Sequence, residues 1–286
     1  MSRPYALLRT GFPYDRTLGM RRLTNTPVDL AVSGDGTLFI LCRGAATGFI
    51  RQLTLEDESP GAVNLMGGGA QTGGTYAVGA KFVWPASLIM DSDENLWVAD
   101  EGTHQVSSFT KEGELVQQWG ELGTGNGQLN RPSGIAFDPD ENLYVVDTQN
   151  HRIQKFTRDG KFLASFGGFG DGEGQFHMPW GIEVDELGDI YVADWRNDRV
   201  QKLTADGQFT FQLGGPGSED GEFNRPSGVT VDQHGDIYVA DRGNNRVQLF
   251  NSRGGFVEKF IGDATLGKQA HSYMITNLMA LRLREM

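Results

Sequence analysis

The chain repeats one alternation of apolar and polar positions five times. Each repeat opens at a proline and continues with a short apolar segment, an aspartate-containing turn and a second segment rich in β-branched and aromatic residues. The opening residues are Pro27, Pro85, Pro132, Pro179 and Pro226, and the last four lie 47 residues apart. In the third repeat the two segments are GIAFD (134–138) and LYVVD (143–147). Runs of this length and composition, bounded by turn residues, predict β-strands.

Two further strands follow in each repeat. A four-residue link leads to a segment such as RIQKF (152–156), which alternates polar and apolar residues as a half-buried strand does. A short turn then leads to an outer segment such as FLASFG (162–167), and a polar, glycine-rich loop connects it to the next repeat. Each repeat therefore predicts a four-stranded antiparallel sheet. Such sheets bury both faces when copies pack around an axis, so we expect an all-β propeller.

The repeats fill most of the chain and predict a single domain over 1–286. Their cores lie at about 27–65, 85–120, 132–167, 179–214 and 226–262. The pattern RPSG(I/V), then (I/Y)VAD, then N(H/N)R(I/V)Q(K/L)F resembles the NHL repeat family over about residues 25–262. The first repeat departs most from this pattern. There Asp29 stands where the others have Gly or Ser, and Cys42 replaces the aspartate that ends the second strand, which is Asp100, Asp147, Asp194 and Asp241 in the other repeats.

The resemblance also implies six blades, because NHL propellers usually have six and commonly close the ring with an N-terminal strand. The segment YALLRTG (5–11) suits that role, yet the fifth repeat already has its own outer strand, GFVEKFIG (255–262). The spare strand therefore predicts a six-bladed design whose sixth blade is incomplete, through truncation or through completion by a partner or second chain. We expect residues 263–286 to form a helical tail. A closed five-bladed ring is the alternative.

Composition and charge narrow the classes of partner. The 40 glycines fit a chain with many turns, and the formal net charge of −12 gives a field that repels nucleic acid. A single cysteine excludes an internal disulfide framework. No apolar run approaches the length of a membrane span, and the N-terminus lacks the apolar core of a secretory signal. We therefore expect a soluble, acidic, cytoplasmic protein that binds neither nucleic acid nor membrane.

The histidines are the first candidates for metal or acid–base chemistry, but their positions favour a structural role. His104 and His151 share a repeat position with Asp198 and Asn245, and a position that accepts all three residue types indicates turn chemistry rather than metal ligation. His177 directly precedes the inner strand of the fourth repeat, where it is better placed for exposure at the channel mouth.

One enzyme branch with NHL repeats, the peptidyl-α-hydroxyglycine α-amidating lyases, is similar in fold. The resemblance implies zinc-binding histidines directly after the proline that opens an inner strand. In this chain those positions hold Val28, Ala86, Ser133, Trp180 and Ser227, none of which binds zinc as histidine does. That activity is disfavoured, and we expect no metal site and no cofactor.

The aspartate that ends the second strand could suggest a ring of catalytic carboxylates. An aspartate before a tight link instead accepts hydrogen bonds from the backbone amides that follow it, and its recurrence in four repeats indicates architecture. Cys42 has no histidine nearby in sequence and indicates a buried thiol. The glycine-rich loops lead into strands rather than helices, so they are not phosphate cradles.

The fourth repeat is the most irregular on the face that carries the inter-blade loops. Trp180 and Glu183 replace small or neutral residues of the inner strand, and Trp195 follows the repeated aspartate. We predict a ligand-binding pocket at the channel mouth, formed by Trp180, Glu183, Asp194, Trp195, Arg131, Arg196, Arg225 and Arg242. The alternative is that Glu183 pairs with an arginine and both tryptophans pack the blades together.

Two functions follow from these patterns. The first is a non-catalytic binding or scaffold propeller that presents its loop face and channel mouth to a protein, peptide or small-molecule ligand, and the lack of a recurring nucleophile–base pair favours it. The alternative is a metal-dependent hydrolase or lyase of the gluconolactonase-like or amidating-lyase-like class. Its candidate oxygen ligands are Asp29, Glu183 and Asp194. RNA binding, as in tripartite-motif proteins with NHL domains, is disfavoured by the net charge.

Overall fold

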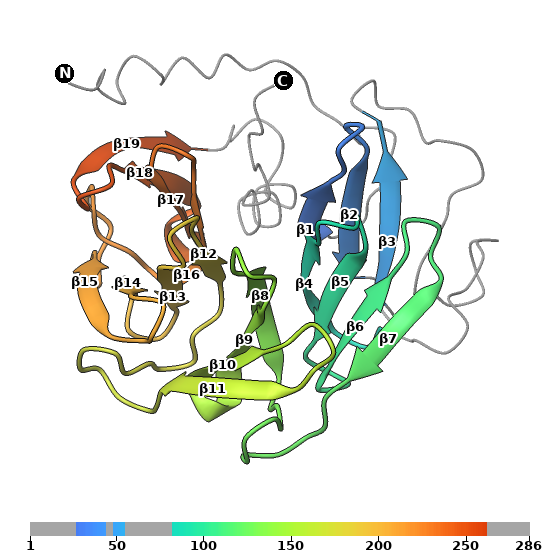
Figure 1. Cartoon of the computed structure of the whole chain (residues 1–286). Helices are drawn as coiled ribbons and strands as arrows, with labels where there is room; N and C mark the ends of the chain where they lie inside the picture. The colour runs from blue at the N-terminus through green and yellow to red at the C-terminus, as the bar shows by residue number, and fades with distance from the viewer. Residues whose placement is uncertain (1–26, 44–47, 55–81, 262–286) are drawn as a thin grey trace.

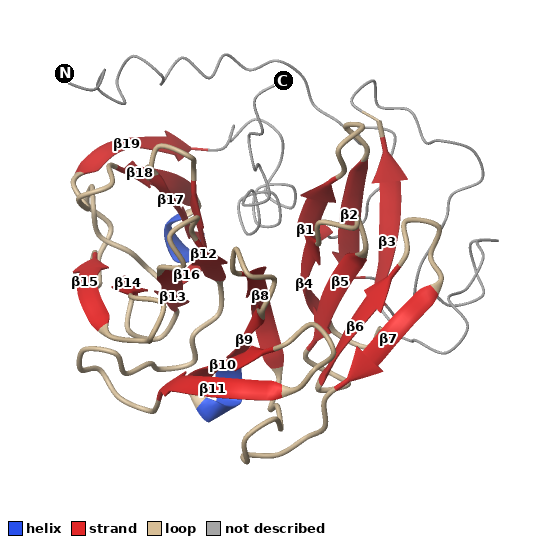
Figure 2. Ribbon diagram, viewed as in Figure 1, coloured by secondary structure: helices blue, strands red, loops and turns tan. Residues whose placement is uncertain are grey.

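The computed structural model describes residues 27–43, 48–54 and 82–261, which form five antiparallel sheets arranged around a common centre (Figure 1). Almost all of the regular structure is β-strand, as Figure 2 shows. The sheet of blade one has three described strands, β1 (Pro27–Val32), β2 (Leu38–Arg43) and β3 (Gly48–Leu53). Blade two contains β4 (Pro85–Met90), β5 (Leu96–Asp100), β6 (Gln105–Phe109) and β7 (Leu115–Trp119).

The other three blades also have four strands, ordered along the sheet as they are along the chain. Blade three contains β8 (Pro132–Phe137), β9 (Leu143–Asp147), β10 (Arg152–Phe156) and β11 (Phe162–Gly167). Blade four contains β12 (Ile182–Val184), β13 (Ile190–Asp194), β14 (Arg199–Leu203) and β15 (Phe209–Leu213). Blade five contains β16 (Pro226–Val231), β17 (Ile237–Asp241), β18 (Arg246–Phe250) and β19 (Phe256–Ile261). Single 3₁₀ turns, η2 (Thr148–Asn150) and η3 (Arg242–Asn244), link the second and third strands of blades three and five.

The prediction of four-stranded antiparallel propeller blades is confirmed, but the six-blade prediction is wrong: the described residues form five blades. The sixth blade was inferred from the N-terminal segment 5–11, and a helical tail was predicted at 263–286. Both segments lie outside the described residues.

The hydrophobic core is divided among the spaces between neighbouring blades. Phe39 of blade one packs with Phe109 of blade two, and Tyr144 of blade three packs with Val192 of blade four. Equivalent clusters join blades two and three and blades four and five. Because a blade buries each face only against its neighbour, side chains that join adjacent blades decide whether the ring holds together.

The innermost strands approach each other closely at two glycines. A Cβ atom on Gly134 would lie 2.6 Å from the Trp180 carbonyl oxygen, and one on Gly181 would lie 2.6 Å from the Gly228 Cα. At this distance the backbones bond directly, since the Gly134 amide donates to the Trp180 oxygen at 2.9 Å. The close approach of the inner strands of blades three, four and five therefore leaves no room for a side chain at Gly134 and Gly181.

A repeated hydrogen-bond cluster anchors the loops that precede blades three, four and five, and we call it the aspartate latch. In blade three it consists of Asp147, Asn150, Arg152 and Gln154. The Asp147 Oδ1 accepts the Asn130 amide of the preceding loop at 2.6 Å, and its Oδ2 accepts from Asn150 Nδ2 and Arg152 Nε, both at 2.8 Å. Arg152 and Gln154 donate onward to carbonyl oxygens of the same loop.

The latch recurs around Asp194 and Asp241 with equivalent partners. The architectural interpretation of the repeated aspartate fits this geometry. The expected donors were only partly right. Asp100 accepts from the Gly102 and Thr103 amides that follow it and from the Val83 and Trp84 amides that precede its blade. Asp147, Asp194 and Asp241 each accept one amide of the preceding loop and take their other hydrogen bonds from Asn, Arg and Gln side chains of their own blade.

The shared turn position of His104, His151, Asp198 and Asn245 adopts the left-handed conformation in blades two to five, with φ between 52° and 61°. Three of these side chains also accept an amide from the next blade. His104 Nδ1 accepts from Arg131, His151 Nδ1 from Met178, and Asp198 Oδ1 from Arg225, at 2.6–3.0 Å. The position therefore serves turn formation and blade-to-blade contact together.

Within the described ranges, no helix is long and apolar enough to cross a membrane.

Candidate functional site

The loop face of the propeller carries the inter-blade loops and the links between second and third strands. On this face, one repeat position lies next to the start of the first strand of the following blade. This position directly follows the latch aspartate or its replacement, and it holds Arg43, Glu101, Thr148, Trp195 and Arg242 in blades one to five. Because the surrounding backbone repeats from blade to blade, the chemical differences between blades at this position come from these side chains.

In blade two the position carries a buried charge. Glu101 is only 3% exposed, and its carboxylate pairs with Arg43 of blade one at 2.8 Å and with Arg131 of blade three at 2.7 Å. Arg43 also lies over the Trp84 ring, 5.0 Å from its centroid. Burial, opposed by the Glu101 carboxylate, lowers the pKa of the Arg43 guanidinium. This bridge neutralises Arg131, one of the residues of the predicted ligand site.

In blade three the position is neutral. The Thr148 hydroxyl shares a hydrogen bond with the Ser133 hydroxyl and donates to the Pro179 carbonyl oxygen at 2.9 Å. Thr148 is buried, so this seam between blades is closed by hydrogen bonds and offers no charge to a ligand.

In blade four the position carries an indole. The Trp195 ring centroid lies 6.1 Å from that of Trp180, 4.8 Å from the Arg196 Cζ and 5.4 Å from the Arg225 Cζ. These are cation–π distances. The structure thus brings together four of the predicted residues, and we call Trp180, Trp195, Arg196 and Arg225 the Trp–Arg site.

The arginines of this site are exposed. Among the described residues, the side chains of Arg196, Arg225 and the neighbouring Arg242 form no ion pair. Arg225 occupies the repeat position of Arg131, which Glu101 neutralises. An aromatic ring attracts a guanidinium but carries no net charge, so the Trp–Arg site keeps its positive charge.

The indole Nε1 of Trp195 is buried without an acceptor among the described residues. The same is true of Trp119, which lies in the core between blades two and three. An indole N–H without an acceptor is therefore not by itself evidence that Trp195 lies in a binding site.

Asp194, another residue of the predicted ligand site, is the acceptor of the latch in blade four. It is fully buried and bonded to Arg199 at 2.9 Å, to Asn197 at 2.8 Å and to the His177 amide at 2.7 Å. Burial raises the pKa of the Asp194 carboxyl even though these donors oppose the shift. The residue cannot reach a ligand without dismantling the loop anchor.

Glu183 and Asp29 lie on inner strands, in blades four and one. The Glu183 Oε2 accepts a hydrogen bond from Thr230 of blade five at 3.1 Å. The Asp29 carboxylate accepts the Leu88 amide at 2.8 Å and the Ser87 hydroxyl at 2.9 Å, both across the seam to blade two. Burial raises the pKa of Asp29 to about 7, and the Glu183 carboxylate adds a smaller upward shift.

A second aromatic group lies on the loop face at the seam between blades three and four. Phe169, His151 and His177 form a cluster with ring centroids 5.0–5.6 Å apart. Phe169 was not singled out from the sequence because its loop varies between repeats, with Leu122 and Pro216 at the equivalent positions. A large apolar residue in an otherwise polar, glycine-rich loop was the signal available.

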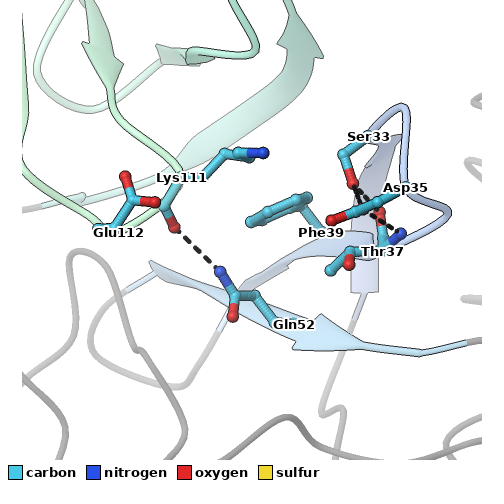
Figure 3. Close-up of a pocket in the computed structure, with 7 residues that line it drawn as sticks. All are labelled: Ser33, Asp35, Thr37, Phe39, Gln52, Lys111 and Glu112. Atoms are coloured by element: carbon cyan, nitrogen blue, oxygen red, sulfur yellow. Dashed lines mark hydrogen bonds between the residues drawn. The ribbon is translucent and has the colours of Figure 1, made fainter.

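A separate polar pocket of about 260 Å³ lies between blades one and two, on the side of the first-to-second-strand turns. Figure 3 shows it between the Lys111–Glu112 turn and the turn that contains Asp35. Gln52 Nε2 donates to the Lys111 carbonyl oxygen at 2.9 Å, and a hydrogen bond from Ser33 is the main cause that lowers the pKa of Asp35 to about 2. Lys111 is paired with Glu94. These groups satisfy one another and present no nucleophile–base pair.

The described part of the chain contains no group of three or more His, Cys, Asp or Glu side chains arranged to hold a metal ion.

Comparison with known proteins identifies the repeat. The NHL repeat model matches residues 129–156, 176–203 and 223–250, which run from the end of an inter-blade loop to the third strand of blades three, four and five. A search of curated proteins finds no match to the chain.

Solved structures share the fold. The structure of a streptogramin B lyase superposes with a TM-score of 0.59 at 15% identity, covering 84% of this chain and 70% of the other. A gluconolactonase from Xanthomonas campestris gives 0.52 at 22% identity, covering 77% and 67%, and a chain of a nidogen–laminin complex gives 0.58 at 17% identity, covering 82% and 80%. At these identities the likeness shows the fold alone. The matched segments show NHL repeats in blades three, four and five, and the shared fold is that of a β-propeller.

Proposed function

We propose that this protein is a binding propeller whose loop face holds an anionic group of its ligand at the Trp–Arg site. The observation that carries the proposal is the contrast between two equivalent arginines. Glu101 neutralises Arg131 at 2.7 Å, whereas Arg225 faces the Trp195 ring instead of a carboxylate.

The charge of the whole chain sharpens this contrast. The formal net charge is −12, yet three exposed arginines lie on the loop face of blades four and five: Arg196, Arg225 and Arg242. An acidic protein with an unneutralised cationic site directs a small anionic group to that site while its overall field repels polyanions. Tryptophan and arginine are also the residues most enriched among the side chains that dominate binding energy.

Direct titration of small anions tests the proposal. We would titrate N-acetylglutamate and inorganic phosphate into the full chain and follow binding by isothermal calorimetry. Arg225→Ala should weaken binding at least tenfold, because a hydrogen bond between charged groups contributes about 1.5–3 kcal/mol and 1.4 kcal/mol corresponds to a factor of ten.

Arg253→Ala is the matched control. Arg253 is exposed in the turn between β18 and β19, far along the blade from the loop face, so its removal changes net charge equally without touching the site. Equal affinity of the wild-type and Arg225→Ala chains would contradict the proposal, as would equal weakening by both variants.

A hydrolase or lyase is the second candidate, and Asp29 is the observation that favours it. A carboxyl with a pKa of about 7 can donate a proton at neutral pH, and Glu183 lies close enough to influence it. Metal analysis of the purified chain and of Glu183→Ala tests the metal-dependent form. Stoichiometric metal that is lost in the variant would support this function, and metal content that is the same in both would contradict it.

A further inference from the structure

The Phe169 ring is the most exposed aromatic side chain of the described residues that lies near the Trp–Arg site. It is 67% exposed, and it stands on the loop between β11 and β12, which a bridge from Phe169 to the buried Phe176 holds in place. Its ring packs edge-on against His151 at 5.0 Å and His177 at 5.1 Å. Exposed aromatic surface held by a fixed loop is typical of a contact site rather than of a core.

The backbone joins this cluster directly to the Trp–Arg site. The His177 carbonyl oxygen accepts the Arg196 amide at 3.1 Å, and the His177 amide donates to Asp194 at 2.7 Å. Arg196 in turn lies over the Trp195 ring. The aromatic cluster and the cationic site are therefore neighbouring parts of one surface.

The packing of His151 favours its neutral form. The His151 Nδ1 accepts the Met178 amide at 2.9 Å, which requires a neutral imidazole at that nitrogen. Burial, and to a smaller extent His177, lowers the pKa of His151. The surface thus places an aromatic subsite beside a cationic one.

Other seams lack this combination. Between blades two and three the equivalent positions hold Leu122, His104 and Asn130, and between blades four and five they hold Pro216, Asp198 and Asn224. Among the described seams, only the one between blades three and four has rings at all three of these loop-face positions. This is also the seam next to the two site tryptophans.

We infer that the partner is an acidic peptide segment that places a carboxylate on the Trp–Arg site and a neighbouring aromatic side chain on Phe169, His151 and His177. This inference rests on the proposed function. Charge complementarity selects an acidic partner, because Arg196, Arg225 and Arg242 form no ion pair among the described residues. Exposed aromatic and arginine side chains side by side are the composition of protein interfaces, whereas small-molecule sites enclose most of the ligand surface.

Fluorescence anisotropy with labelled peptides tests the inference. The probes are a glycine-based peptide with one Glu, one with one Phe, and a set with both, separated by zero to four glycines. The best two-residue peptide should bind at least fivefold more tightly than the Glu peptide, because contact with an exposed aromatic ring adds apolar burial. Phe169→Ala should remove this gain and leave the Glu peptide unaffected. Leu122→Ala is the matched control, since Leu122 is 60% exposed at the equivalent loop position, and it should change neither affinity.

The outcomes separate the inference from the proposed function. Binding of the Glu peptide without any gain from Phe at any spacing overturns the inference and leaves the anion site standing. A gain that survives Phe169→Ala, or that Leu122→Ala removes equally, also overturns it. Failure of every peptide and of the small anions to bind refutes the proposed function together with the inference. A gain that Phe169→Ala alone removes supports both.

Discussion

Removal of the Asp194 carboxylate tests whether the repeated aspartate is an architectural element. In Asp194→Ala the side chain of Arg199, only 8% exposed, loses its carboxylate partner, and the Asn197 side chain and the His177 amide each lose an acceptor. Breaking a buried ion pair by removing one partner costs about 3–5 kcal/mol. Arg199 keeps hydrogen bonds to loop carbonyl oxygens, so we expect a loss of unfolding free energy near 4 kcal/mol, which is a large part of the roughly 5–15 kcal/mol that holds a typical domain folded.

A second variant, Asp194→Asn, separates the contribution of the negative charge from that of the side-chain shape. Burial raises the pKa of Asp194 despite Arg199, which indicates that the ion pair does not fully offset the cost of removing the carboxylate from water. Asp194→Asn keeps one acceptor oxygen for Asn197 and Arg199, but its NH2 group then faces the His177 amide, which loses its acceptor, so the loss should be smaller than for Asp194→Ala, about 1–3 kcal/mol.

Equilibrium unfolding in guanidinium chloride measures both values. Asp171→Ala is the control, because Asp171 is exposed on the same loop and its side chain lies outside the latch, and its effect should stay within about 0.5 kcal/mol. Asp147→Ala and Asp241→Ala should resemble Asp194→Ala. A loss below about 1 kcal/mol for Asp194→Ala, or a larger loss for the asparagine variant, would refute this account of the latch.

Two further predictions concern pH and turn geometry. Burial raises the pKa of Asp29 from 3.8 to about 7, so between these pH values the folded chain holds a proton that the unfolded chain has lost. This protonation stabilises the fold fully below pH 3.8, and the stabilisation disappears as the pH rises to 7. The free energy of unfolding should therefore fall by up to about 4 kcal/mol over this range. Asp29→Asn should remove that part of the fall in unfolding free energy between pH 4.5 and 7.5, and an unchanged pH dependence would argue against it. His151→Asp should keep stability within about 0.5 kcal/mol, because Asp198 fills the same left-handed position and accepts the same amide, whereas His151→Val should lose about 1–3 kcal/mol in thermal unfolding. Equal stability of these two variants would contradict the role given to the turn.

The strands could be predicted from the sequence because each blade repeats the same local sequence signals. Turn residues, β-branched runs and the repeat period agree with one another in blades two to five, so secondary structure and packing follow from local chemistry. The structural role of His104 and His151 could also be predicted from the sequence, because Asp198 and Asn245 fill the same repeat position.

Contacts between repeats were harder to predict. The strand pattern made Arg152 and Gln154 look like the outward side of a half-buried strand, yet Gln154 is fully buried in the latch. The Glu101 bridge joins three blades, and its partners lie 58 and 30 residues away along the chain, so no periodicity reveals it. The same limit applies to Arg131, whose partner Glu101 lies in the neighbouring blade, whereas Asp194 is paired with Arg199 of its own blade.

Replacement of Trp195 tests the central claim most directly, namely that blade four binds an anion because an indole stands where blade two has a carboxylate. Calorimetric titration of N-acetylglutamate would compare Trp195→Glu with Trp195→Phe, which keeps an aromatic ring next to Arg225. Trp195→Glu should pair with Arg225 as Glu101 pairs with Arg131 and should abolish binding, while Trp195→Phe should retain most of the affinity. Undiminished binding by Trp195→Glu would contradict the account.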